Sequence, residues 1–223
     1  METYDEALKW IHGIQAFGKK PGLKRMEWMM EKLEHPEKKL SIIHVTGTNG
    51  KGSTVAFIRH LLESQGKIVG TFTSPYIEIF NERISVNGEP ISNEEILKLA
   101  NKIYPLTKEL EKTALGGPSE FEVITTMMLY YFSKEPIDVA VIEVGIGGLL
   151  DSTNVVTPEV SVITTIGMDH MVLLGNTLSD IATQKAGIIK PKIPVVTGNI
   201  REESLKIIQQ KADETKSILY KYQ

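Results

Sequence analysis

Residues 42–54 hold the feature that most constrains this chain: a β-branched apolar run that stops at a cluster of glycines and continues into an apolar pattern of helical period. The run predicts a short buried strand, and the sequence GTNGKGS at positions 47–53 predicts a tight turn. A strand, glycine-rich turn and helix in this order bring backbone N–H groups and the positive end of a helix toward an anion. The unit therefore predicts a phosphate-binding turn.

The residues of this turn suit a nucleotide. Lys51 would neutralise phosphate charge, and the hydroxyl of Ser53 would ligate Mg²⁺. The predicted nucleotide-binding residues are Gly47, Thr48, Asn49, Gly50, Lys51, Gly52 and Ser53. The spacing of this motif differs from that of the usual phosphate loop, which has four residues between its glycines and a hydroxyl directly after the lysine. Here two residues separate Gly47 from Gly50, and a glycine precedes Ser53. An ordinary turn between a strand and a helix is the alternative, since Gly and Asn favour tight turns.

Bulk properties exclude several classes of function. The 223 residues suit one large domain, or one domain and part of another. The net charge of −3 gives no basic field for nucleic acid, and the absence of cysteine excludes disulfides and thiolate chemistry. The N-terminus resembles no secretory signal, and no apolar run approaches the roughly 18 residues of a membrane span. We expect a cytoplasmic monomer that binds neither nucleic acid nor a membrane.

Strand and helix patterns alternate along the rest of the chain. Helices are predicted over 3–13, 23–34, 51–65, 92–112, 119–134, 177–187 and 201–214, and residues 14–22 are predicted to form a loop. Strands are predicted over 42–46, 68–72, 137–144, 160–166, 194–197 and 217–222, with an edge strand over 83–86. This order predicts an α/β fold with a doubly wound, mostly parallel sheet and helices on both faces.

Polar side chains follow several of the predicted strands, at the edge where ligands bind in open α/β sheets. Glu143 ends an otherwise apolar strand, where a carboxylate is costly to bury unless Mg²⁺ or another partner offsets its charge. A strand-end glutamate exposed to water is the alternative. Ser74 and His170 follow two other predicted strands. Imidazole is an uncommon Mg²⁺ ligand, so a capped turn residue or a hydrogen-bonded core group is the alternative for His170. The helical pattern around Lys185 is typical of a solvated surface lysine.

Several sequence blocks carry a resemblance that spans nearly the whole chain. They are HVTGTNGKGS at 44–53, TSP at 73–75, FNERI at 80–84, VIEVGIGG at 141–148, DSTN at 151–154, DH at 169–170, LGNTL at 174–178 and KAGIIK at 185–190. Together they resemble folylpolyglutamate synthase, called dihydrofolate synthase in bifunctional members, of the Mur ligase superfamily. The resemblance implies an ATP-dependent amide ligase that forms an acyl phosphate on a folate carboxylate and then attaches L-glutamate. Dihydropteroate is a second acceptor to be considered.

The same resemblance implies roles for individual residues. It gives catalytic roles to Lys51, His170 and Lys185, with Lys185 carbamylated. It implies magnesium sites formed by Ser53, Ser74, Glu143 and His170. It further implies a folate-side loop from Ser74 to Arg83, in which Tyr76 and Phe80 pack on a pterin and Arg83 helps to bind the substrate.

Members of the resembled family run to roughly twice this length, with a C-terminal domain that closes over ATP. We therefore expect residues 1–223 to form the ATP-binding domain, with 1–40 as a helical lead-in, and to lack the C-terminal ligase domain and most ligase activity. A Mur ligase for UDP-linked substrates needs a domain of about 90 residues before the phosphate loop, and a 46-residue lead-in is too short for one. An ATP-binding module without ligase chemistry, or a Mur-type ligase without folate specificity, remains the alternative.

Overall fold

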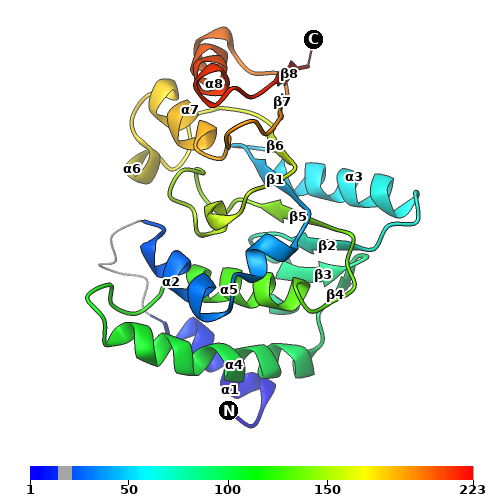
Figure 1. The fold of residues 1–223 in the computed structure, drawn as a ribbon, viewed down its shortest axis with the longest axis vertical. Coiled ribbons are helices and arrows are strands. Elements are labelled where there is room, and N and C mark those ends of the chain that lie inside the picture. Colours follow the sequence, from blue (N-terminus) through cyan, green and yellow to red (C-terminus); the bar gives the residue numbers. More distant parts are fainter. Residues whose placement is uncertain (15–21, 223) are drawn as a thin grey trace.

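The strands of the described chain form one eight-stranded sheet, in the order β4-β3-β2-β5-β1-β6-β7-β8 (Figure 1). The computed structural model describes residues 1–14 and 22–222. The strands are β1 Ile42–Thr46, β2 Val69–Phe72, β3 Ile84–Val86, β4 Glu89–Pro90, β5 Val139–Glu143, β6 Val160–Ile163, β7 Val195–Thr197 and β8 Leu219–Lys221. The pairs from β2 through β5, β1, β6 and β7 to β8 are parallel, whereas β3 and β4 pair in antiparallel fashion. The predicted mostly parallel α/β sheet is thus confirmed.

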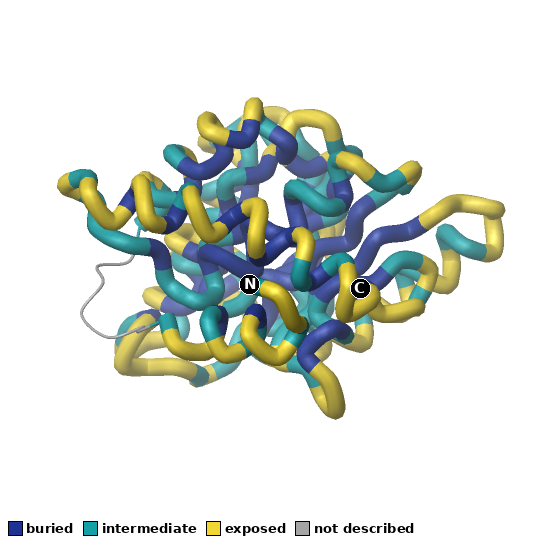
Figure 2. Tube along the Cα trace, turned by 90° about the horizontal axis from the view of Figure 1, so that it is seen from below, coloured by how far each residue is buried: buried dark blue, intermediate teal, exposed yellow. Residues whose placement is uncertain are grey.

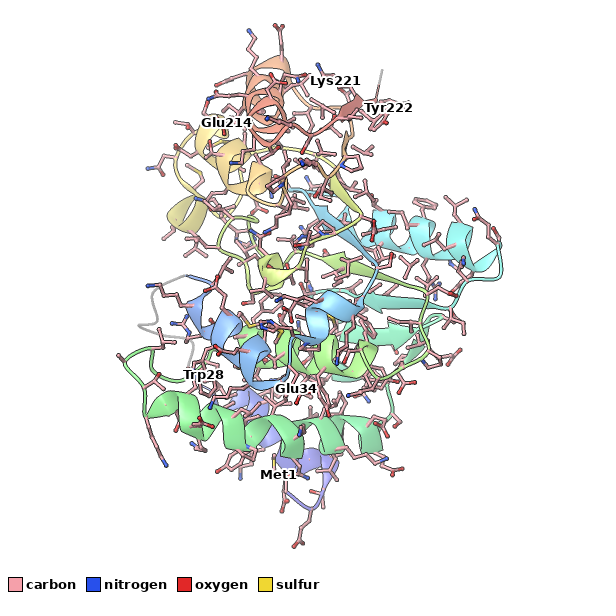
Figure 3. All side chains as sticks on the ribbon, viewed as in Figure 1. Met1, Trp28, Glu34, Glu214, Lys221 and Tyr222 are labelled. Carbon is pink, nitrogen blue, oxygen red and sulfur yellow. The ribbon has the colours of Figure 1, made fainter. Side chains whose placement is uncertain are left out.

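Helices lie on both sides of this sheet, with their outer surfaces exposed and the central strands buried between them (Figures 1 and 2). The α-helices are α1 Tyr4–His12, α2 Lys24–Lys32, α3 Lys51–Glu63, α4 Asn93–Glu111, α5 Glu120–Phe132, α6 Met171–Leu174, α7 Leu178–Ala186 and α8 Glu202–Thr215. Short 3-10 helices span Pro36–Lys39, Phe80–Arg83 and Ser152–Val155. The two ends of the described chain lie far apart, with Met1 beside α1 and Tyr222 beyond β8 (Figure 3). No helix in the described ranges is long and apolar enough to cross a membrane.

The alternation of side chains along β1 and β5 builds two cores. Val45 and Val141 pack with residues of α3 on one face, whereas Ile42 and Ile142 belong to the core that α2, α4 and α5 cover. Because successive residues of a strand point to opposite faces, Glu143 at the end of β5 lies on the α3 face. His44, between Ile43 and Val45 in β1, lies on the opposite face.

The predicted boundaries were wrong at a few places. Residues 84–86 do not form the edge of the sheet, because β4 pairs outside them. The strand predicted over 160–166 ends at Ile163, since the side chains of Thr164 and Thr165 instead bond to the backbone of Asn49. The strand predicted over 137–144 is shorter, Val139–Glu143. Most of the loop predicted over 14–22 lies outside the described residues.

Packing of α5 against β2 generates a stability prediction. Phe132 is 1% exposed, and a Cβ atom added to Gly70 would lie 3.0 Å from its ring. We expect Phe132→Ala to lower the free energy of unfolding by about 3–5 kcal/mol, measured by chemical denaturation. The control Phe57→Ala lies on α3, where the ring is 69% exposed, and should change it by less than about 0.5 kcal/mol. Equal losses in the two variants would contradict the described packing.

Candidate active site

The start of α3 is open to an anion. The helix begins at Lys51, directly after Gly50, whose φ of 81° is in the left-handed region that favours glycine. No described side chain caps this helix, and its first turn carries no acidic residue. The first N–H groups of a helix lack partners within the helix and carry the positive end of its dipole. The predicted loop therefore presents free donors and positive charge at one point, as a phosphate requires.

Residues at the end of β6 hold the loop in this shape. The hydroxyl of Thr164 donates to the carbonyl of Asn49 at 2.6 Å, and the N–H of Asn49 donates to the hydroxyl of Thr165 at 2.9 Å. A Cβ atom on Gly47 would lie only 1.8 Å from the Thr164 hydroxyl, so this position requires glycine. Sequence reasoning missed both threonines, although two hydroxyls directly after an apolar strand were the available signal.

Lys51 folds back over its own loop. Its Nζ donates to the carbonyls of Gly47 at 3.0 Å and Thr48 at 3.4 Å. Its charge also acts on Glu143, whose pKa it lowers. The ammonium group thus lies against the phosphate-binding turn, and its charge acts on a carboxylate of the neighbouring strand β5.

Glu143 is a buried carboxylate with few partners. The residue is 5% exposed, so the alternative of a solvated strand-end glutamate is wrong. Burial raises the pKa of Glu143, and the charge of Lys51 and the N–H of Ser74, which donates at 3.3 Å, oppose that rise. A Cβ atom on Gly52 would lie 3.6 Å from its Oε2, which places the carboxylate beside the first turn of α3.

These residues fit a magnesium ion that a nucleotide helps to bind. The donor set near α3 consists of the Glu143 carboxylate and the Ser53 and Ser74 hydroxyls, and hard oxygen ligands are those that Mg²⁺ prefers. Within the described ranges, no group of three or more His, Asp or Glu side chains could hold a metal. A cation here would therefore depend on phosphate oxygens and water for its remaining ligands.

A cavity of about 420 Å³ lies beside Ser74, the partner of Glu143. Its lining residues are Ser74, Pro75, Arg83, Phe121, Gly145, Ile146, Asp151 and His170. The cavity brings together the predicted residues Ser74 and Arg83, from the two ends of one loop, and His170, from a distant segment of the chain. Ser74 joins the two halves of the site, because its N–H bonds to Glu143 while the residue lines the cavity. Asp151 stood in a resembled sequence block but was not predicted as a site residue.

His170 lines the cavity from the start of α6. Its backbone is left-handed, with φ of 45° and ψ of 40°, and its side chain is 49% exposed. The nearest described acidic group is Asp169, with Oδ2 at 3.6 Å from Nε2. The ring is thus half-exposed rather than buried in the core, and can reach a ligand in the cavity.

The residues predicted to bind substrate form an aromatic–cation cluster. The guanidinium of Arg83 lies 5.1 Å from the ring centre of Tyr76 and 5.9 Å from that of Phe80. Phe80 is 4% exposed and belongs to the main core, whereas Arg83 lines the cavity. The burial of Phe80 suits a residue that supports Tyr76 and Arg83 better than one that packs on a ligand.

Lys185 is buried, so its interpretation as a solvated surface lysine is wrong. The residue is 3% exposed because α7 packs on the loop after β5: a Cβ atom on Gly148 would lie 3.2 Å from the Lys185 carbonyl. Burial, aided by the charge of Lys51, lowers the pKa of Lys185 to about 8, while Asp169 and Asp151 oppose this shift. A helical pattern in the sequence cannot show that a loop covers this face.

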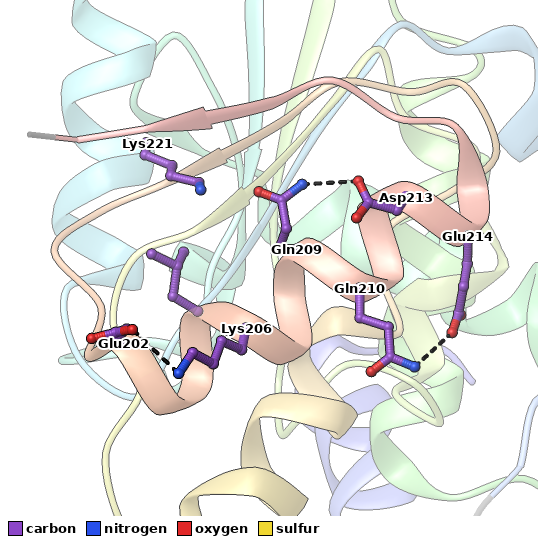
Figure 4. A pocket seen from close by; sticks show the side chains of 8 residues that line it. Glu202, Lys206, Gln209, Gln210, Asp213, Glu214 and Lys221 are labelled. Atoms are coloured by element: carbon purple, nitrogen blue, oxygen red, sulfur yellow. Dashed lines mark hydrogen bonds and ion pairs between the residues drawn. The ribbon is translucent and has the colours of Figure 1, made fainter.

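Another cavity, of about 600 Å³, lies away from these residues (Figure 4). It runs along the outside of α8 beside Lys221, and side chains one helical turn apart pair along it. These pairs are Glu202 with Lys206 at 3.2 Å, Gln209 with Asp213 at 2.9 Å and Gln210 with Glu214 at 3.1 Å. Such pairs stabilise an exposed helix surface, and this groove takes no part in the site at the strand ends.

The chain belongs to the Mur ligase family, whose middle-domain model matches residues 45–223. In sequence it is 54% identical over 212 residues to a dihydrofolate synthase/folylpolyglutamate synthase of Bacillus subtilis, a match that covers 95% of this chain. It is 43% identical over 216 residues to a folylpolyglutamate synthase of Lacticaseibacillus casei, with 96% of this chain covered. The chain spans about half the length of these relatives, 49% and 50%.

Solved structures of the same group share the fold. A complex of folylpolyglutamate synthase with AMPPCP and folate superposes with a TM-score of 0.94 and 42% identity, over 98% of this chain and 54% of that one. The Thermotoga maritima folylpolyglutamate synthase gives a TM-score of 0.90 and 40% identity, over 98% of this chain and 49% of that one. The predicted family is therefore confirmed.

The burial of Lys185 predicts a pH-dependent cost in stability. Replacing Lys185 by Met keeps the length of the side chain and removes the buried amine, so we expect the variant to unfold with a higher free energy at neutral pH. Between the folded pKa of about 8 and the ordinary 10.5, the unfolded chain binds a proton that the folded chain does not. The stability of the parent should therefore rise with pH in this window, and the advantage of Lys185→Met should shrink.

Chemical denaturation from about pH 7 to about pH 10 measures this difference. The control is Lys206→Met on α8, a lysine whose side chain is 75% exposed, which should show no such trend. A difference between Lys185→Met and the parent that stays constant with pH would contradict the inferred burial of the amine.

Proposed function

We propose that this chain supplies the ATP-binding part of an ATP-dependent amide ligase that joins L-glutamate to folate. One observation carries the proposal: the uncapped start of α3 with Lys51, and a cavity suited to an acceptor, meet at Ser74 and Glu143. The AMPPCP and folate complex of a similar folylpolyglutamate synthase supports both halves of this assignment. An ATP-binding module without ligase chemistry, or a Mur-type ligase without folate specificity, is the competing proposal.

The proposed reaction has two steps. A carboxylate oxygen of the folate attacks the γ-phosphorus of ATP, the bond from that phosphorus to the bridging oxygen breaks, and ADP leaves. The amine of L-glutamate then attacks the acyl carbon, phosphate leaves and the amine loses a proton. Both steps join anionic reactants, so positioning and charge neutralisation supply most of the rate.

The residues divide these tasks by position. The turn at 47–53 would hold the phosphates on the N–H groups of α3, and Lys51 would neutralise their charge. Magnesium, when bound, would offset the repulsion between the triphosphate and the acceptor carboxylate. Its proposed ligands are Ser53, Ser74, Glu143 and His170. The aromatic–cation cluster of Tyr76, Phe80 and Arg83 would place a guanidinium at the cavity for an acidic or aromatic acceptor.

The remaining assignments extend the same proposal. Dihydropteroate is proposed as a second acceptor, because it presents a carboxylate on the same kind of p-aminobenzoyl group. The protein is proposed to act as a cytoplasmic monomer on these small molecules, apart from nucleic acid and membranes. Residues 1–223 are proposed as a Mur-type ATP-binding domain with residues 1–40 as its helical lead-in.

Titration calorimetry of the 223-residue chain tests the proposal. We expect AMPPCP to bind in the presence of Mg²⁺, and folate to bind to the nucleotide-loaded chain. Lys51→Met should weaken AMPPCP binding roughly tenfold to a hundredfold, the range for loss of a charged hydrogen bond. Lys67→Met is the matched control, since Lys67 is 49% exposed and pairs with Asp138 at 3.8 Å. AMPPCP binding with no response to folate would favour the competing proposal, and equal binding by Lys51→Met would refute the phosphate site.

Lys185 is proposed to carry a carbamate, which would convert a buried cation into an anion near the magnesium site. Carbamate forms from the neutral amine, and a pKa of about 8 makes that form accessible near neutral pH. At a fixed concentration of dissolved ¹³CO₂, we expect a carbamate signal in the ¹³C NMR spectrum that grows as the pH rises through about 8. The signal should vanish in Lys185→Met and persist in Lys190→Arg. A signal that persists in Lys185→Met would assign the carbamate elsewhere.

A further inference from the structure

The strand that leads into the phosphate loop also holds the loop that lines the acceptor cavity. His44 and Thr46 lie on the face of β1 opposite α3, and both are fully buried. The hydroxyl of Thr46 donates to the carbonyl of Gly147 at 2.7 Å. His44 Nε2 lies 2.8 Å from the hydroxyl of Thr153. Two side chains of β1 thus contact the segment from 145 to 153, which follows β5.

The contact through His44 continues to the cavity. The Thr153 hydroxyl lies 2.5 Å from Oδ1 of Asp151, and the Thr153 N–H donates to the same oxygen at 3.0 Å. The other oxygen, Oδ2, accepts the N–H of Ile146 at 2.9 Å. Asp151 and Ile146 both line the cavity. The relay therefore runs from His44 through Thr153 and Asp151 to the backbone of Ile146.

The directions of these bonds follow from the protons available. Burial raises the pKa of Asp151, and the Thr153 hydroxyl and the N–H groups of Ile146, Thr153 and Gly145, which stabilise the carboxylate, oppose that rise. The Thr153 hydroxyl donates its single proton to Oδ1 of Asp151. The hydroxyl must then accept from His44, which fixes the proton of the imidazole on Nε2. His44 Nδ1 is buried without a partner among the described residues. Burial and the charge of Lys190 lower the pKa of His44 to about 3, which agrees with a neutral ring.

We propose that His44 is a positioning residue for the acceptor: through Thr153 it orients Asp151, and Asp151 fixes the cavity wall at Ile146. The proposal rests on the proposed function, because it takes the 420 Å³ cavity as the acceptor site. His44 does not belong to the residues that line the cavity and acts through the other members of the relay. Its loss should impair folate binding while leaving the phosphate turn, which Thr164 and Thr165 hold, intact.

Amide hydrogen exchange tests the relay without any ligand. In His44→Leu and Thr153→Val, protection of the Ile146 N–H should fall about tenfold, on the scale of one lost hydrogen bond. His44→Gln keeps a donor near the position of Nε2, and Thr153→Ser keeps the hydroxyl, so both should restore the protection. Ser161→Ala is the matched control: Ser161 pairs with His44 in the strand register and its hydroxyl donates to Ile188 at 2.9 Å, away from the cavity. Unchanged protection of Ile146 in His44→Leu would overturn the relay.

Calorimetry then separates positioning from general loss of structure. In His44→Leu and Thr153→Val, we expect the folate affinity of the AMPPCP-loaded chain to fall about tenfold while the AMPPCP affinity changes less than twofold, with recovery in His44→Gln and Thr153→Ser. Parallel losses of both affinities, or unchanged folate affinity in a variant whose Ile146 protection falls, would overturn the role in acceptor binding. If the parent binds AMPPCP but not folate, the proposed acceptor and the role of His44 in binding it are both refuted. The hydrogen-exchange experiment then still tests whether His44 holds Ile146 through Thr153 and Asp151.

Discussion

The structure depends on β1 making contacts on both faces of the sheet. Its odd-numbered residues pack under α3 and so fix the position of the phosphate turn, while His44 and Thr46 hold the loop after β5 from the other face. Strand alternation makes this division unavoidable, because a shift of one residue would exchange the two sets. The phosphate turn and the cavity wall are therefore both attached to β1, which pairs with β5 on one side and β6 on the other. A large displacement of either one would require β1 to shift relative to these two strands.

The site also holds buried ionisable groups whose charged forms are destabilised by burial. Burial raises the pKa of Glu143 and lowers that of Lys185, so each group is displaced toward its neutral form. Lys51 opposes the first shift and increases the second, since its positive charge stabilises a carboxylate and repels an ammonium. A protein that needed only stability would replace these groups with apolar side chains. Their retention at the strand ends is the arrangement expected where bound anions and cations complete the charge balance.

Local signals allowed the sequence to predict much of the fold. The turn at 47–53 was predictable because its strand, glycines and helix are contiguous, and helix starts were predictable where a capping side chain lies three residues before its partner, as Ser119 does for Glu122. The burial of Lys185 was not predictable, because it depends on the loop around Gly148, which lies 37 residues earlier in the chain. The hydroxyls of Thr164 and Thr165 escaped notice for a related reason: they are ordinary strand-end residues until the sheet brings them to Asn49.

The position of Ser74 explains why the two halves of the site form one unit. Its N–H bonds to the carboxylate that lies beside α3, and the residue also lines the cavity, so the distance between the phosphate turn and the cavity is set close to the end of β2. Phosphoryl transfer to a carboxylate requires the two reactants to be held close and in line. Parallel strands satisfy this requirement directly, because β2 and β5 are neighbours and their carboxyl ends meet at the same edge of the sheet. The cavity proposed for the acceptor lies at that edge because β5 carries Glu143 as its last residue and then continues into the wall that Asp151 and Ile146 form.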